Sequence, residues 1–209
     1  MDTIKISSQE INPTAPGDRR IIETVEPDSA GNIECDVVII GSGMGGSTFA
    51  HGIKDKNLKV VIVERGDFLP RENDNWDVNA VFSNGKYRNA ESWFDRNYNP
   101  FKPGVFYYVG GNTKFYGAML PRWREEDFQN LVHRDGLSPK WPVSYAELEP
   151  YYCQAEDLYK VHGDAGSYPV EPWRSRDYRW KGLKHDHALH GLVKSMEKQG
   201  LKPFSMPAA

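Results

Sequence analysis

A glycine-rich turn is the stretch of this sequence whose residue types and spacing could do chemistry. It reads Gly41-Ser42-Gly43-Met44-Gly45-Gly46 and fits the pattern G-x-G-x-x-G. In such a turn the first glycine makes a tight bend and the second lets backbone N–H groups approach a pyrophosphate. The third lets a helix pack close to a strand. The sequence therefore predicts that this turn binds the phosphates of a dinucleotide.

Two strands and one helix must position this turn. Residues 35–40 form a short apolar run rich in β-branched side chains, which predicts a strand buried on both faces. We expect a helix over residues 44–54, with the phosphates at its N-terminus, and a second strand over residues 58–63. Glu64 ends that strand 21 residues after Gly43. A carboxylate there can accept hydrogen bonds from the hydroxyls of an adenosine ribose.

The stretch after the second strand bears on which dinucleotide binds. An NAD(P) domain normally continues with further βαβ units, and no second apolar strand with an amphipathic helix follows Glu64. Residues 67–104 are instead rich in Asn, Asp, Arg and aromatic side chains, without helical or strand periodicity. This favours an FAD-type domain and leaves an NAD(P) enzyme as the weaker alternative.

The bulk properties of the chain limit its class and its partners. Its 209 residues carry a formal net charge of −3, which provides no positive field for nucleic acid or an acidic membrane. Cys35 and Cys153 have no metal or redox spacing and fit a reducing compartment. No long apolar run follows the Arg19-Arg20 pair, as a twin-arginine export signal would require. We expect a cytoplasmic protein with no nucleic-acid or membrane partner.

A second glycine segment could also face a ligand. Val109-Gly110-Gly111-Asn112-Thr113 follows a short aromatic, β-prone run, and Gly117 comes a little later. A Gly-Gly turn beside Asn and Thr can expose backbone N–H groups to a bound molecule. Taken alone, this segment predicts only a turn.

The two glycine segments and the acid between them resemble one enzyme family, the glucose-methanol-choline (GMC) oxidoreductases. The matching residues are the Gly41–Gly46 turn, the strand end Glu64-Arg65-Gly66, and Gly110, Gly111, Asn112, Thr113 and Gly117. Tyr116-Gly117 stands where the family has Asn-Gly. The resemblance implies that the second segment lies along a flavin and that these residues, Arg65 included, bind FAD.

The resemblance also implies a domain organisation. The stretch Trp141–Tyr152 is similar to the linker of the sugar-oxidising branch, which includes pyranose oxidase and fructose dehydrogenase. The implied fold class is α/β, with a Rossmann-like FAD-binding domain that is incomplete in this chain and the start of an α+β substrate domain. The corresponding divisions are a polar arm over 1–33, the FAD-binding portion over 34–140, and the helical linker with the beginning of the substrate domain over 141–209.

The activity implied by the resemblance is oxidation of the CH–OH group of a sugar or another alcohol, with a hydride passing to flavin N5. The family's histidine base lies in its C-terminal part, so we assign no catalytic residue here, and no metal ligand. Phe115 stands where some relatives carry a histidine that tethers the flavin, which predicts non-covalent FAD. The alternative is a non-catalytic, truncated or split chain that needs a separately encoded C-terminal half.

The last third of the chain predicts two helices. Ser144 and Glu147 form a capping box for a first turn, and Pro150 suits the start of a longer helix to about residue 161. Side chains at helical spacing predict its packing face, namely Leu148, Tyr152, Ala155 and Tyr159. A second amphipathic helix is expected from Ala188 to just before Gly200.

Two charged groups remain, and both predict solvated surface. Arg122 and Arg124 precede Glu125 and Glu126, which favours an exposed ion-pair cluster over a site for an anionic ligand. Three histidines lie close together without a further ligand at metal spacing, so they predict exposed polar surface. They are His185, His187 and His190.

Overall fold

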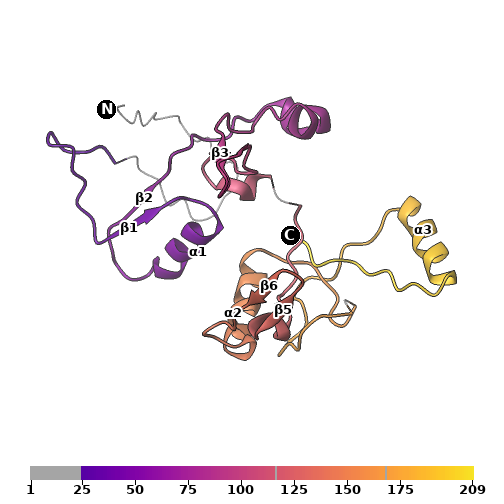
Figure 1. The fold of residues 1–209 in the computed structure, drawn as a ribbon. Helices are drawn as coiled ribbons and strands as arrows, with labels where there is room; N and C mark the ends of the chain where they lie inside the picture. The colour runs from indigo at the N-terminus through magenta and orange to yellow at the C-terminus, as the bar shows by residue number, and fades with distance from the viewer. Residues whose placement is uncertain (1–24, 116, 168) are drawn as a thin grey trace. The chain divides into compact units, whose positions relative to one another are not determined.

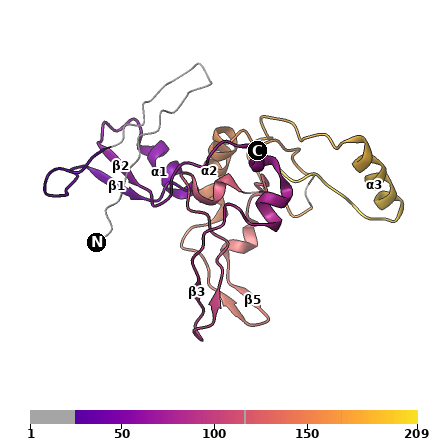
Figure 2. The same ribbon diagram turned by 90° about the horizontal axis from the view of Figure 1, so that it is seen from above.

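The computed structural model describes residues 25–115, 117–167 and 169–209. The chain divides into two compact units, the first ending at Phe115 and the second beginning at Tyr116 (Figures 1 and 2). Arg19-Arg20, most of the predicted polar arm, and Tyr116 lie outside the described residues. The domain boundaries at 33 and 140 stay predictions.

The first unit is built on a strand, a helix and a second strand, as the sequence predicts. β1 (Val37–Ile40) leads through the glycine turn into α1 (Met44–Ile53), and β2 (Val60–Val63) returns beside β1. The two strands are parallel, with Val37 opposite Val60 and Ile40 opposite Val63. Figure 1 shows α1 lying next to this pair. The glycine turn directly follows β1, and α1 forms the crossover to the parallel strand β2. The turn therefore lies at the edge of the pair where both strands have their carboxyl ends.

The predicted burial of the first strand on both faces is wrong for this chain. Ile39 is buried, but Val38 is 57% exposed and Ile40 is 87% exposed. β1 pairs with β2 alone among the described residues, so its other edge and part of its surface have no neighbour. Ile62 and Val63 of β2 are also exposed. The apolar run predicts the strand correctly, and the exposure reflects the missing neighbours.

The rest of the first unit consists of short elements. They are the 3-10 turn η1 (Asn73–Trp76), the π-helical turn η2 (Asn79–Ser83), the antiparallel pair β3 (Trp93–Phe94) and β4 (Pro100–Phe101), and the 3-10 turn η3 (Gly111–Lys114). The predicted absence of a second βαβ unit after Glu64 is therefore confirmed within the described residues. The small core of this part of the first unit includes Val81 and Tyr87.

The second unit combines a hairpin with two helices. Its elements are η4 (Glu125–Phe128), the antiparallel strands β5 (Leu131–His133) and β6 (Gly136–Ser138), α2 (Tyr145–Leu158) and α3 (His187–Lys198). The predicted second amphipathic helix is confirmed as α3, which Asp186 caps through Leu189 N–H. None of the helices in the described parts of the chain is both long and apolar enough to cross a bilayer.

α2 differs from its prediction in one respect. The capping box is confirmed, because Ser144 accepts from Glu147 N–H while the Glu147 carboxylate accepts from Ser144 N–H at 2.8 Å. Pro150, however, lies inside one continuous helix and does not start a second one. Proline removes one helical hydrogen bond, and burial of side chains on both sides of Pro150 offsets that loss.

The packing face of α2 is also displaced from the predicted one. The predicted side chains are half-buried, whereas the buried ones are Tyr145, Glu149, Cys153 and Glu156. Apolar periodicity fails here because two of the four buried residues are acidic. Their burial requires a cation, which comes from outside the helix.

That cation is Arg122, so its predicted place in a solvated cluster is wrong. Its side chain is 1% exposed and its Nε and Nη2 contact the two Glu156 oxygens at 2.7 and 2.9 Å. Nη1 donates to Glu149 at 2.9 Å and to the Tyr145 hydroxyl at 3.0 Å. Nη2 also lies 3.2 Å from the Cys153 sulfur. Arg122 thus contacts all four buried side chains of α2.

The other charged groups lie at the surface as predicted. Arg124 pairs with Glu126 and Asp127 in a partly exposed cluster. The three neighbouring histidines, His185, His187 and His190, are exposed. Within the described parts of the chain, no three His, Cys, Asp or Glu side chains gather in a way that could hold a metal ion.

Candidate dinucleotide-binding site

The glycine turn takes the shape that its spacing predicts. Gly41 has φ of +90°, a conformation that L side chains rarely adopt, and its N–H donates to Val63 at 2.7 Å. A Cβ at Gly46 would lie 2.1 Å from the Gly41 carbonyl oxygen and 3.0 Å from Ile39 Cγ2. Gly46 therefore allows the close approach of α1 to β1, and Gly41 makes the tight bend.

Gly43 stands at the open side of the same turn. It is the N-cap of α1, with ordinary φ of −65°, and a Cβ there would meet no atom within 4 Å. The same is true of Gly45. Among the described residues no side chain caps this helix end, and no acidic residue lies in its first turn. The backbone N–H groups and the helix dipole at Met44 thus fit an anionic phosphate.

Glu64 is held at the end of β2 by the turn itself. Its Oε2 accepts from Ser42 N–H at 2.8 Å and from the Ser42 hydroxyl at 2.5 Å, while Oε1 accepts from Gly66 N–H at 3.0 Å. Partial burial would raise the pKa of Glu64, but these hydrogen bonds outweigh it and lower the pKa below its ordinary value. The carboxylate is therefore ionised at neutral pH. Because Oε2 already accepts two hydrogen bonds, Oε1 is the oxygen with capacity for a ribose hydroxyl.

Ser42 joins the two glycine segments. Its hydroxyl, which donates to Glu64, also accepts from Gly110 N–H at 2.8 Å across 68 residues of sequence. A Cβ at Gly111 would lie 3.5 Å from Gly43 Cα. Ser42 itself is 7% exposed. The structure thus brings the turn, the acid and the Gly-Gly segment together, as the sequence analysis expects.

The polar side chains of the second segment shape its backbone. Asn112 accepts from Phe106 N–H at 2.9 Å and donates to Gly104 at 3.2 Å. The Thr113 hydroxyl donates to the Gly110 carbonyl at 2.6 Å. These bonds use the side chains that the sequence analysis predicts to face a flavin. In the structure, the Asn112 and Thr113 side chains hold the backbone of the second segment in place.

Two predicted residues are not part of this cluster. Arg65 pairs with Glu91 at 2.5 Å and its guanidinium lies 3.8 Å from the centre of the Tyr107 ring. Its side chain is thereby engaged away from the glycine turn. Gly117 belongs to the second unit and is exposed.

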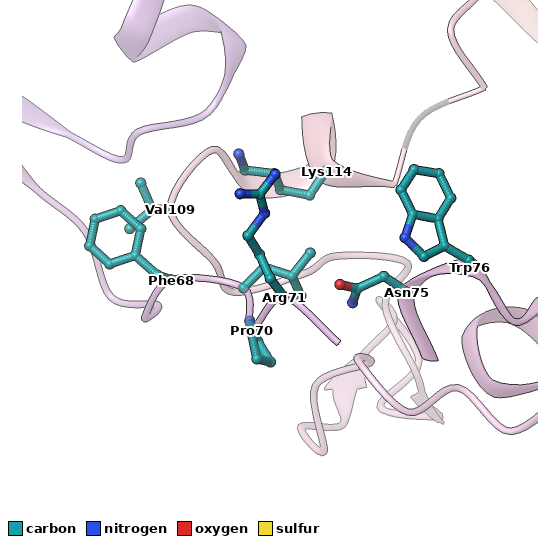
Figure 3. Close-up of a pocket in the computed structure, with 8 residues that line it drawn as sticks. Phe68, Pro70, Arg71, Asn75, Trp76, Val109 and Lys114 are labelled. Carbon is teal, nitrogen blue, oxygen red and sulfur yellow. The ribbon is translucent and has the colours of Figure 1, made fainter. Parts of the chain in front are cut away.

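A pocket that the sequence analysis missed lies beside the second segment. It encloses about 440 Å³, and its lining includes Phe68, Arg71, Asn75, Trp76, Val109 and Lys114 (Figure 3). Residues 67–76 follow no recognisable motif, so the sequence alone does not indicate a pocket here. The one available signal is Lys114, a cation placed directly after Asn112-Thr113.

Comparison with known proteins bears on the fold and the class of this chain. A family profile described as "NAD(P)-binding Rossmann-like domain" matches residues 39–96. A 6'''-hydroxyparomomycin C oxidase of Streptomyces lividus is 31% identical over 94% of this chain and 35% of its own length. A paromamine 6'-oxidase of Streptomyces fradiae is 33% identical over 83% of the chain and 30% of its own length.

Two further similarities agree with these. The fructose dehydrogenase large subunit of Gluconobacter japonicus is 29% identical over 85% of the chain and 37% of its own length. The solved structure of an FAD-dependent oxidoreductase from Chaetomium thermophilum matches with a TM-score of 0.50 at 16% identity, covering 84% of this chain and 31% of that one, which shows a shared fold.

The chain spans about a third of the length of the curated relatives it matches, with 35%, 30% and 37% of three of them covered. Those relatives are oxidases and a dehydrogenase, and the matched share fits an N-terminal portion. The predicted Rossmann-like α/β class is confirmed. Along most of its length the chain resembles the glucose-methanol-choline oxidoreductases, whose cofactor is FAD.

Proposed function

We propose that this chain is the FAD-binding portion of an oxidoreductase that acts on the CH–OH group of a sugar or another alcohol. The observation that supports it most is the cluster in which Ser42 joins the glycine turn, Glu64 and Gly110. The names of the relatives point to sugar-like and simple alcohols, among them fructose and 2-methyl-1,2-propanediol. FAD would supply the hydride acceptor.

The chain's own residues would bind and orient that cofactor. The N-terminus of α1, at Gly43 and Met44, would hold the phosphates through backbone N–H groups. Oε1 of Glu64 would accept from the adenosine ribose. Gly110 and Gly111, fixed against the turn, would lie along the flavin. We propose no catalytic base in this chain.

The remaining assignments concern the complete protein. We propose that residues 34–140 form the FAD-binding portion and that residues 141–209 begin the substrate domain. A cytoplasmic location is supported by two cysteines that form no disulfide, Cys35 and Cys153.

A second candidate function is a non-catalytic flavin-binding chain that needs a separately encoded C-terminal half. Apolar side chains of β1 and β2 are exposed, and Ile40 is 87% exposed, which favours another polypeptide segment that covers them. An open reading frame for such a half directly downstream in the genome would support this candidate over a single longer polypeptide.

Gly43→Ala should weaken FAD binding about tenfold or more, equivalent to about 1.4 kcal/mol. The added Cβ enters space that is open in the structure and that we assign to the phosphates. Equilibrium titration with FAD measures the change. Gly52→Ala is the matched control, because Gly52 lies on the same helix, also with nothing within 4 Å of a Cβ, and far from the turn. Equal FAD affinity in the two variants would contradict the role of Gly43.

The flavin should be held non-covalently. Phe115, which stands at the tethering position, offers no nucleophilic atom and stacks on Phe106 with ring centres 4.0 Å apart. Acid precipitation of the flavin-loaded protein should release the yellow colour into the supernatant. Colour that stays in the pellet would show that another residue forms a bond to the flavin.

A further inference from the structure

The pocket beside the second glycine segment lies next to the candidate cofactor site. Val109 N–H donates to the Asp67 carbonyl at 3.0 Å, so the pocket wall joins the chain after β2 to the Gly-Gly segment. The Lys114 side chain passes close over Gly110, where a Cβ would lie 2.7 Å from Lys114 Cε. Gly110 in turn contacts Ser42 of the glycine turn. The pocket is therefore a neighbour of the phosphate end of α1.

This pocket carries two positive charges without a negative one. Arg71 and Lys114 are its charged lining residues, and Figure 3 shows the Arg71 guanidinium extending toward Lys114. In the parts of the chain that the structure describes, neither side chain forms an ion pair, so both exposed charges are available to an anion. Two like charges that point toward one another repel, and an anion between them removes that repulsion. The chain as a whole carries a formal net charge of −3, so the positive charge of this pocket is a local feature.

We propose that Arg71 and Lys114 bind the diphosphate of the dinucleotide. This inference rests on the proposed FAD function and adds two side chains to the backbone groups of the glycine turn. A diphosphate carries about two negative charges, which matches the two cations, and guanidinium and ammonium groups are the usual side-chain partners of phosphate oxygens. The neutral parts of the cofactor, its ribose and its flavin ring, have no such need for cations.

Lys114→Gln and Arg71→Gln should each weaken binding of FAD and of ADP about tenfold, because a charge-assisted hydrogen bond is lost. Adenosine, which lacks phosphates, should bind the variants and the unchanged chain equally. Separate titrations with ADP and with adenosine distinguish the contribution of the phosphates to the binding free energy from that of the nucleoside. Both side chains are exposed, so neither substitution should alter the thermal unfolding temperature.

Lys114→Arg and Lys86→Gln are the controls. Lys114→Arg keeps the charge and should retain most of the ADP affinity. Lys86→Gln removes a cation that is already paired with Glu72 and Asp74 and should change nothing. Unchanged ADP affinity in both pocket variants, or an equal loss for adenosine, would overturn the assignment. If the unchanged chain binds ADP but not FAD, the proposed function fails while the phosphate site stands.

Discussion

Gly46→Ala is expected to weaken FAD binding about a hundredfold by disrupting the strand-helix-strand unit. A Cβ at this position would lie 2.1 Å from the Gly41 carbonyl oxygen, a backbone atom that cannot move without opening the turn. Overpacking typically costs about 1 to 3 kcal/mol, and the upper end of that range corresponds to a loss of about a hundredfold in affinity if α1 must shift before FAD binds. FAD titration and far-ultraviolet circular dichroism measure the two effects.

The Gly52→Ala variant is again the control for this experiment. It adds the same methyl group to α1 at a position where nothing lies within 4 Å. Alanine is the better helix former, so this variant should be as stable as the unchanged chain or slightly more stable. Normal FAD affinity in Gly46→Ala would contradict the close packing of α1 against β1.

The second large effect is expected at Arg122 in the second unit. Arg122→Ala leaves Glu149 buried without a cation and Glu156 paired with Arg174 alone, and breaking a buried ion pair from one side typically costs about 3 to 5 kcal/mol. Urea unfolding followed by tryptophan fluorescence measures the loss. Arg124→Ala is the matched control two residues away, where a partly exposed pair is typically worth about 1 kcal/mol or less. Equal effects of the two substitutions would contradict the buried network.

The contribution of this network should depend on pH in a defined direction. Burial alone would raise the pKa of Glu149, but hydrogen bonds from Ser175 N–H and from Arg122 outweigh it and lower the pKa from 4.5 to about 2. A carboxyl group with a lowered pKa stabilises the folded state above its unfolded pKa and loses that contribution as the pH falls through the folded pKa. The difference in stability between the unchanged chain and Arg122→Ala should therefore shrink between about pH 4.5 and pH 2.

The local elements of the first unit could be predicted from sequence because local pattern determines them. The β-branched runs, the G-x-G-x-x-G spacing and Glu64 identify β1, α1 and β2 to within a few residues. The capping box at Ser144 and the amphipathic pattern of α3 work for the same reason. Each depends on neighbours in the sequence.

The contacts between distant segments could not be predicted in this way. The bond between Ser42 and Gly110 spans 68 residues, and Ser42 occupies a position that the motif leaves open. The sequence predicts Arg122 at the surface, because a charged residue beside two glutamates is normally solvated, whereas its actual partners lie 27 and 34 residues away on α2. The two partners, Glu149 and Glu156, are acidic, so apolar periodicity does not identify the buried face of α2.

Addition of FAD to the purified 209-residue chain tests the central claim most directly. Equilibrium dialysis should show one FAD bound per chain, with the absorption bands of bound flavin, and ADP should displace it, while NAD and NADP should bind more weakly than FAD. Failure to bind FAD, or tighter binding of NAD or NADP than of FAD, would contradict the assignment of the Gly41–Gly46 turn, Glu64 and the Gly110–Gly111 segment to a flavin site.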